Sequence, residues 1–127
     1  MSEEVRNVNY VGIDIGSTAS KVVVRGTSDM QFVLPTGWSS KETTQTIKEK
    51  LKENDVDVLG DETKVVATGY GRIAVDFADY VITEITCHAR GAHYLDPSVR
   101  TVVDIGGQDS KVIRLDEQGN VVNFVMN

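Results

Sequence analysis

Cysteine is almost absent from this 127-residue chain, which contains Cys87 alone. An intrachain disulfide is therefore impossible, and we expect a reducing, cytoplasmic setting. Basic residues are also few, because 13 Lys and Arg stand against 19 Asp and Glu and leave a formal net charge of −6. That charge argues against a general affinity for nucleic acid, which requires clustered Lys and Arg.

Long apolar runs are missing as well. The first ten residues, MSEEVRNVNY, carry acids and no apolar core, so neither a signal peptide nor a membrane-spanning helix is expected there. The chain is 40% hydrophobic and 25% charged, which is typical of soluble globular proteins. Its length suits one ordinary domain or part of a larger protein.

The chain does contain an internal repeat. The segments DIGSTASKV (14–22) and DIGGQDSKV (104–112) share six of nine positions and lie 90 residues apart, which is 104 minus 14. In each segment an apolar run ends at Asp, breaks at Gly and resumes, a pattern that predicts strand, tight turn, strand. Gly lets backbone N–H groups approach an anion, and the following hydroxyl and amide side chains donate hydrogen bonds. We therefore predict two turns that bind one polyphosphate from two sides, with an Asp beside each that holds Mg²⁺ or its waters.

The pattern around the first copy predicts an antiparallel meander followed by helices and strands, in the order βββαβαβα. Ser39 followed three residues later by Glu42 forms a capping box and predicts the start of the first helix. The other predicted elements are strands at 8–15, 20–25, 31–34, 64–68 and 81–82, a short helical segment at 72–78, and a helix that ends before Pro97.

The second copy opens three further strands, at 100–105, 111–115 and 121–125. We expect residues 1–97 to form a first domain and residues 98–127 to form the opening strands of a second. These strands are rich in Val and Ile, and nothing after them would cover one face of their sheet. We therefore expect the chain to be a fragment that associates with itself.

Four stretches, in this order, resemble a known family: VGIDIGSTASKVVV, VATGYGR, TEITCHARGA and TVVDIGGQDSKVI. From about Tyr10 to Asn127 the chain is similar to the ATPase activators of 2-hydroxyacyl-CoA dehydratases, such as that of 2-hydroxyglutaryl-CoA dehydratase, and to the ATPase subunits of benzoyl-CoA reductase. DIGSTASK alone is typical of the wider superfamily of actin-like ATPases, sugar kinases and heat-shock chaperones. The combination of ATGYGR with DIGGQD is typical of a much narrower group of proteins, the activator family.

The resemblance implies an α/β fold built from ribonuclease-H-like domains, as in the actin, sugar kinase and heat-shock ATPase superfamily, with ATP between two such domains. It implies catalytic roles for Asp14, Asp104 and Gln108, with both Asp residues holding Mg²⁺ directly or through water. Gln108 either orients the attacking water or holds the Mg²⁺ ligands. The residues expected to bind the nucleotide phosphates are Gly16, Ser17, Thr18, Lys21, Gly106, Gly107, Gln108 and Asp109.

Lys21 and Lys111 occupy the same repeat position, and for each the alternative is a surface lysine at the sheet edge. Lys21 is the stronger candidate for a phosphate contact. Cys87 lies within a helical pattern and does not match the cysteines that hold the iron-sulfur cluster in the family. We therefore interpret it as a packing residue. Glu84 and His88 share a helix face, and we interpret them as an ordinary side-chain pair.

The resemblance also implies cofactors and partners. Members of the family are homodimers with one four-iron four-sulfur (4Fe-4S) cluster between the subunits. ATP hydrolysis there drives a conformational change, after which the reduced cluster passes one electron to the dehydratase component. The implied cofactors are therefore ATP, Mg²⁺ and a 4Fe-4S cluster, and the implied partners are the dehydratase, an electron donor such as ferredoxin or flavodoxin, and a second subunit. Because the cluster cysteines and the segment that contacts adenosine are absent from this chain, we expect it to be inactive by itself.

Two other classes of protein use the same turns. A sugar or small-carboxylate kinase would transfer the phosphate to an acceptor, and it would need an acceptor pocket. An actin-like or chaperone-like module would use the nucleotide only to set its conformation, without iron. Cysteines downstream of the second turn would favour the activator over both alternatives.

Overall fold

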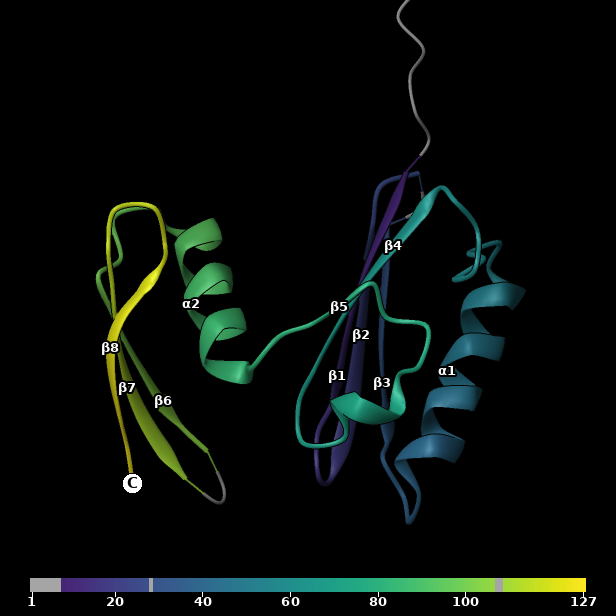
Figure 1. Cartoon of the computed structure of the whole chain (residues 1–127), viewed down its shortest axis with the longest axis horizontal. Coiled ribbons are helices and arrows are strands. Elements are labelled where there is room, and N and C mark those ends of the chain that lie inside the picture. Colours follow the sequence, from purple (N-terminus) through teal and green to yellow (C-terminus); the bar gives the residue numbers. More distant parts are fainter. Residues whose placement is uncertain (1–7, 28, 107–108) are drawn as a thin grey trace, which may run out of the picture. The chain divides into compact units, whose positions relative to one another are not determined.

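The computed structural model describes residues 8–27, 29–106 and 109–127. They form two compact units, which divide between Ile82 and Thr83. Each unit is built from one β-sheet and one α-helix that packs on it (Figure 1).

The first unit contains a five-stranded sheet in the order β3-β2-β1-β4-β5. Its elements are β1 (Asn9–Ile15), β2 (Ala19–Arg25), β3 (Met30–Pro35), α1 (Ser40–Glu53), β4 (Thr63–Thr68), the 3₁₀ helix η1 (Arg72–Ala74) and β5 (Tyr80–Val81). The predicted antiparallel meander of β1, β2 and β3 is confirmed, whereas β4 runs parallel to β1. The carboxyl ends of β1 and β4 therefore meet at one edge of the sheet, where open α/β sheets bind ligands.

The core of the first unit lies between the sheet and α1. Val11, Ile13 and Ile15 alternate along β1 and are buried, because every second side chain of a strand points to the same face. Ile47 and Leu51 are four residues apart on α1 and belong to the same buried core. Burying a side chain of this size stabilises the fold by about 1.5–3 kcal/mol, so the end of β1 is firmly held.

One helical prediction in this unit is too long. The sequence predicted a helical segment at 72–78, but only Arg72–Ala74 forms a helical turn. Asp79 explains the difference, because its N–H donates to the Val65 carbonyl at 2.8 Å and its carboxylate accepts the Val65 N–H at 2.7 Å. These two bonds draw the chain back to the sheet before a second helical turn forms.

The second unit contains a three-stranded antiparallel sheet in the order β6-β7-β8. Its elements are α2 (Glu84–Leu95), β6 (Thr101–Ile105), β7 (Ser110–Leu115) and β8 (Val121–Met126). Ala89 of α2 packs in one core with Ile113 and Leu115 of β7, so α2 covers one face of this sheet.

Helix α2 therefore lies with the second sheet, although the predicted first domain, residues 1–97, includes it. The packing of Ala89 and a hydrogen bond from Arg90 to the Gln118 carbonyl at 3.3 Å hold the helix there. The compact unit thus begins at Thr83, whereas residue 98 stays the predicted start of the second domain.

The other face of the second sheet is apolar and exposed within this chain. Val103, Val112 and Val125 are neighbours across the three strands and are 63%, 40% and 66% exposed. An uncovered apolar face was predicted from the sequence, and self-association through it stays a prediction. No helix of the described ranges is both long and apolar enough to cross a membrane.

Candidate phosphate-binding site

The first turn, residues 14–21, connects β1 to β2 at the edge where β1 and β4 end. Within it the Gly16 N–H donates to the Ala19 carbonyl at 3.1 Å. A Cβ atom on Gly16 would lie 2.5 Å from that carbonyl oxygen, so only glycine fits this bend. Ser17 and Thr18 follow the bend and are exposed, as side chains that bind a ligand must be.

Asp14 and Lys21 lie opposite each other across this turn. Their Oδ2 and Nζ atoms are 3.5 Å apart, and the two side chains are 34% and 48% exposed. An ion pair that exposed contributes only about 0–1 kcal/mol to stability. Lys21 is therefore free to leave Asp14 for a more negative group such as a phosphate.

The second turn, residues 104–111, shows the same two features in its described residues. The Gly106 N–H donates to the Asp109 carbonyl at 2.8 Å, and Asp104 lies opposite Lys111 in the strand register. The repeat seen in the sequence is thus a repeat of backbone geometry. The same Gly bond and the same Asp–Lys register occur in each unit.

Lys111 differs from its counterpart in its surroundings. It is 5% exposed, and its Nζ lies 3.1 Å from both Asp104 Oδ2 and Asp109 Oδ1. Burial alone would lower the pKa of Lys111, but hydrogen bonds to the two carboxylates outweigh it and raise the pKa above its ordinary value. Lys111 is a fixed cation of the second turn. The predicted site residues Gly107 and Gln108 lie outside the described residues.

His88 lies beside Asp104 of the second turn, a position that was not predicted from the sequence. Helix α2 brings its Nδ1 to 3.5 Å from Asp104 Oδ2, and this nitrogen is buried without a hydrogen bond among the described residues. The sequence interpretation paired His88 with Glu84, but it is Asp104 that lies beside it. Helical spacing shows which residues share a face of α2, whereas the strand that this face meets depends on tertiary packing.

The loop after β4, residues 69–71, packs on the first turn. The Gly71 N–H donates to the Ile15 carbonyl at 2.9 Å, and a Cβ on Gly71 would lie 2.5 Å from the Ser40 Oγ. Gly69 has a φ of +94°, and a Cβ there would collide with Asp14 Oδ1. No role was predicted for this glycine-rich loop from its residues. The structure places it against the carboxylate of the first turn.

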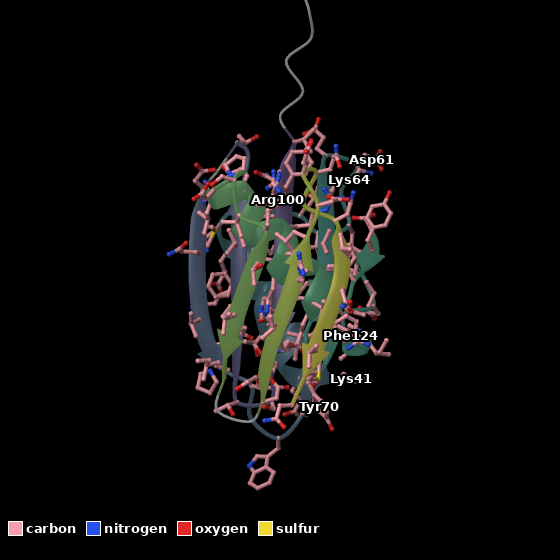
Figure 2. All side chains as sticks on the ribbon, turned by 90° about the vertical axis from the view of Figure 1, so that its left-hand side faces the viewer. Lys41, Asp61, Lys64, Tyr70, Arg100 and Phe124 are labelled. Carbon is pink, nitrogen blue, oxygen red and sulfur yellow. The ribbon has the colours of Figure 1, made fainter. Side chains whose placement is uncertain are left out.

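The start of α1 and this loop lie at the same end of the first unit. Figure 2 shows Lys41 and Tyr70 at one end and Asp61 and Lys64 at the other. Tyr70 is 80% exposed, so the loop presents an aromatic ring beside the first turn.

Thr68 completes the surroundings of Asp14. It ends β4 in register with Asp14, and the two side chains therefore point to the same face of the sheet. Its Oγ1 is buried and has no hydrogen-bond partner among the described residues. Such an atom is suited to bind a ligand or an ordered water.

The donor atoms fit some cofactors and not others. The described residues contain no group of three or more His, Cys, Asp and Glu that could hold a metal. Mg²⁺ fits the chemistry of either turn taken by itself, because it takes one or two carboxylates and completes its shell with waters and phosphate oxygens, and each turn has one such carboxylate, Asp14 or Asp104. A 4Fe-4S cluster does not fit, because it needs several thiolates and Cys87 is the single cysteine of the chain.

Comparisons with known proteins agree with this geometry. The family model described as BadF/BadG/BcrA/BcrD ATPase family matches residues 11–127. An uncharacterised protein of Escherichia coli K12, YjiL, is 46% identical over 92% of this chain and 45% of its own length. The 2-hydroxyisocaproyl-CoA dehydratase activator of Clostridioides difficile is 44% identical over 92% of this chain and 45% of its own length.

Solved structures show the same fold. Component A of the (R)-2-hydroxyglutaryl-CoA dehydratase of Acidaminococcus fermentans matches with a TM-score of 0.79 at 36% identity, over 94% of this chain and 47% of its own. The activator of the 2-hydroxyisocaproyl-CoA dehydratase from Clostridium difficile, solved with bound ADPNP, matches with a TM-score of 0.72 at 37% identity, over 94% of this chain and 46% of its own. The predicted fold class is confirmed. The chain spans about half the length of the relatives it matches.

Proposed function

Because the chain belongs to the BadF/BadG/BcrA/BcrD ATPase family, we propose that it supplies the phosphate-binding turns of an ATP-hydrolysing activator of a 2-hydroxyacyl-CoA dehydratase. The observation that carries the proposal is the repeated turn. In both copies Asp lies opposite Lys in the strand register, and the Gly N–H donates to the carbonyl three residues later. The named dehydratase activators among the relatives support it. Activity and partners are proposed for the whole protein.

In this proposal the first turn binds the phosphates directly. ATP hydrolysis needs positioned donors and little covalent help from the protein. Backbone N–H groups after Gly16 and the hydroxyls of Ser17 and Thr18 donate to phosphate oxygens. Lys21 moves from Asp14 to the phosphates and neutralises part of their charge, which its weak ion pair permits.

The second turn binds the same polyphosphate at Gly106, Gly107 and Asp109, through backbone N–H groups that follow Gly106, while the Asp109 carboxylate stays with Lys111. Asp14 and Asp104 would hold Mg²⁺, directly or through water, and the ion would supply positive charge against the charge that develops on the phosphates. Gln108 orients the attacking water or holds the Mg²⁺ ligands. The water oxygen bonds to the γ-phosphorus, the bond from that phosphorus to the β–γ bridging oxygen breaks, and ADP and phosphate leave. Lys111 stays between Asp104 and Asp109 throughout.

The redox part of the activity belongs to the whole protein. We propose that it is a cytoplasmic homodimer with one 4Fe-4S cluster, which would supply the one-electron chemistry between a ferredoxin or flavodoxin donor and the dehydratase component. Cys87 is not a ligand in this proposal, because it is half-buried in α2 and stands alone. No described residue takes part in the electron transfer.

The test is to express the full-length protein without oxygen and to measure iron, acid-labile sulfide and ATP hydrolysis on one sample. We expect about four iron and four sulfide per dimer, as one 4Fe-4S cluster requires, together with hydrolysis of ATP. Iron-free protein that still hydrolyses ATP would contradict the redox role. It would favour the kinase or the conformational module, which phosphorylation of an added sugar or carboxylate would then distinguish.

A further inference from the structure

A buried threonine holds the first turn from behind. Thr36 lies between β3 and α1 and is only 5% exposed, although its side chain is polar. Its hydroxyl donates to the Gly16 carbonyl at 2.6 Å, and its backbone N–H donates to the Thr18 carbonyl at 3.0 Å. One residue therefore fixes two carbonyl groups of a turn that is distant in sequence.

The remaining polar atoms of Thr36 are also bonded. Ser20, which is fully buried, places its Oγ 2.8 Å from the Thr36 Oγ1. Because Thr36 donates its one hydroxyl hydrogen to Gly16, the hydroxyl of Ser20 must be the donor in that contact. The Thr36 carbonyl accepts a hydrogen bond from the Thr43 hydroxyl of α1. A buried network in which every polar group is hydrogen-bonded is rigid, because another arrangement of its side chains would break some of these bonds.

This network decides which groups the turn presents to an anion. The C=O and N–H groups of one trans peptide point in opposite directions. Since Thr36 draws the Gly16 carbonyl into the protein, the Ser17 N–H of the same peptide points away from the core. A carbonyl oxygen repels a phosphate and an N–H attracts it, so the orientation favours the anion.

We propose that Thr36 is a positioning residue for the polyphosphate site, acting through the Gly16–Ser17 peptide. The inference rests on the proposed function, because it assumes that this turn binds the phosphates of a nucleotide. It adds a residue that lies outside both repeated segments and that does not touch the nucleotide itself.

The test compares three variants of the full-length protein. Thr36→Val removes the hydroxyl and keeps the shape, whereas Thr36→Ser keeps the hydroxyl. Thr44→Val is the matched control, because Thr44 is also buried, at 3% exposed, and its hydroxyl bonds the Ser40 carbonyl at 2.7 Å within α1, away from the turn. Calorimetry measures the Kd of Mg²⁺–ADPNP, thermal unfolding measures stability, and steady-state kinetics separate KM from kcat.

We expect Thr36→Val to raise the Kd for ADPNP and the KM for ATP about tenfold with a smaller change in kcat, since the bond that orients the Gly16 carbonyl is lost together with the bond from Ser20. Thr36→Ser and Thr44→Val should stay within about twofold of the unchanged protein in both constants. Thr44→Val should be destabilised less than Thr36→Val, because the Ser40 carbonyl keeps the backbone hydrogen bond of the helix. Equal effects of Thr36→Val and Thr44→Val on the Kd would overturn the inference alone. Absence of ADPNP binding by the unchanged protein would overturn the proposed function and the inference with it.

Discussion

Lys21 and Lys111 occupy the same repeat position, but they differ in exposure and in the number of carboxylates beside them. Lys21 is half-exposed with one acidic neighbour at 3.5 Å, whereas Lys111 is buried between two carboxylates at 3.1 Å. The sequence favoured Lys21 over Lys111 as a phosphate contact. The geometry of the described residues gives a physical reason for that preference.

Two substitutions distinguish a lysine that stabilises the fold from a lysine that binds phosphate. Lys111→Met leaves Asp104 and Asp109 without their cation, and we expect it to lower the free energy of unfolding by about 1–3 kcal/mol. Lys21→Met removes an exposed ion pair, so it should lower the free energy of unfolding by less than about 1 kcal/mol. The affinity of this variant for ADPNP should fall. Urea unfolding and calorimetry on both variants check this. A larger loss of stability from Lys21→Met than from Lys111→Met would contradict it.

The residues of the site were predictable to different degrees. The turn that contains Asp14, Gly16 and Lys21 was predicted, because an apolar run that breaks at Gly and resumes indicates strand, tight turn, strand. The roles of these residues in binding stay a prediction. Thr36 is 20 residues from the carbonyl it holds, and a lone threonine after a strand gives no signal of that contact. Contacts of this kind arise only when separate elements pack.

At the scale of elements, the two helices begin in different ways. The Ser39 Oγ accepts the Glu42 N–H at 3.2 Å at the start of α1, as the predicted capping box requires. Thr83 occupies the same position at the start of α2, but its side chain makes no capping bond. Both residues have extended backbone, but the Thr83 Oγ1 lies 3.4 Å from the Thr86 Oγ1 and bonds no backbone N–H of the helix.

This difference makes a matched test of capping. Ser39→Ala should lower the free energy of unfolding by about 1 kcal/mol, because it leaves an N–H of the first helical turn without its acceptor. Thr83→Ala should change it by less than about 0.5 kcal/mol, since no cap is lost. Chemical unfolding followed by circular dichroism measures both. Equal losses in the two variants would show that the Ser39 bond contributes nothing.

Element positions were largely predictable, whereas partner elements were not. Alternation of apolar residues gave the strands around each turn, and apolar spacing gave both helices. The early end of η1 depends on the hydrogen bonds between Asp79 and Val65, which are 14 residues apart. The packing of α2 on the second sheet likewise depends on Ala89 meeting Ile113 and Leu115, which no local pattern shows.

At the scale of the whole molecule, Asp116 and Lys111 are two of the groups that make the stability of the second unit depend on pH. Backbone N–H donation from Asn120, with further hydrogen bonds from Asn120 and Gln118, lowers the pKa of Asp116 below its ordinary 3.8. Its contribution is therefore complete above that value and is lost as the pH falls below it. The pKa of Lys111 is raised above its ordinary 10.5, so its contribution is complete below that value and is lost at higher pH.

We therefore expect neither group to change the free energy of unfolding between about pH 5 and pH 9. Below that range, Asp116→Asn should make the urea midpoint less dependent on pH than in the unchanged protein, because the group that takes up a proton is gone. Urea titrations from acid to neutral pH measure this. The same slope in both proteins below about pH 4 would contradict the assignment.

The central claim is that both turns bind the phosphates of one nucleotide. The most direct measurement is calorimetric titration of the full-length protein with Mg²⁺–ADPNP, repeated with Asp14→Asn and with Asp104→Asn. The account predicts one nucleotide per chain and at least about a tenfold weaker Kd in each variant, because each substitution removes one of the two carboxylates proposed to hold Mg²⁺. Two nucleotides per chain, or a Kd unchanged in either variant that still folds, would contradict it.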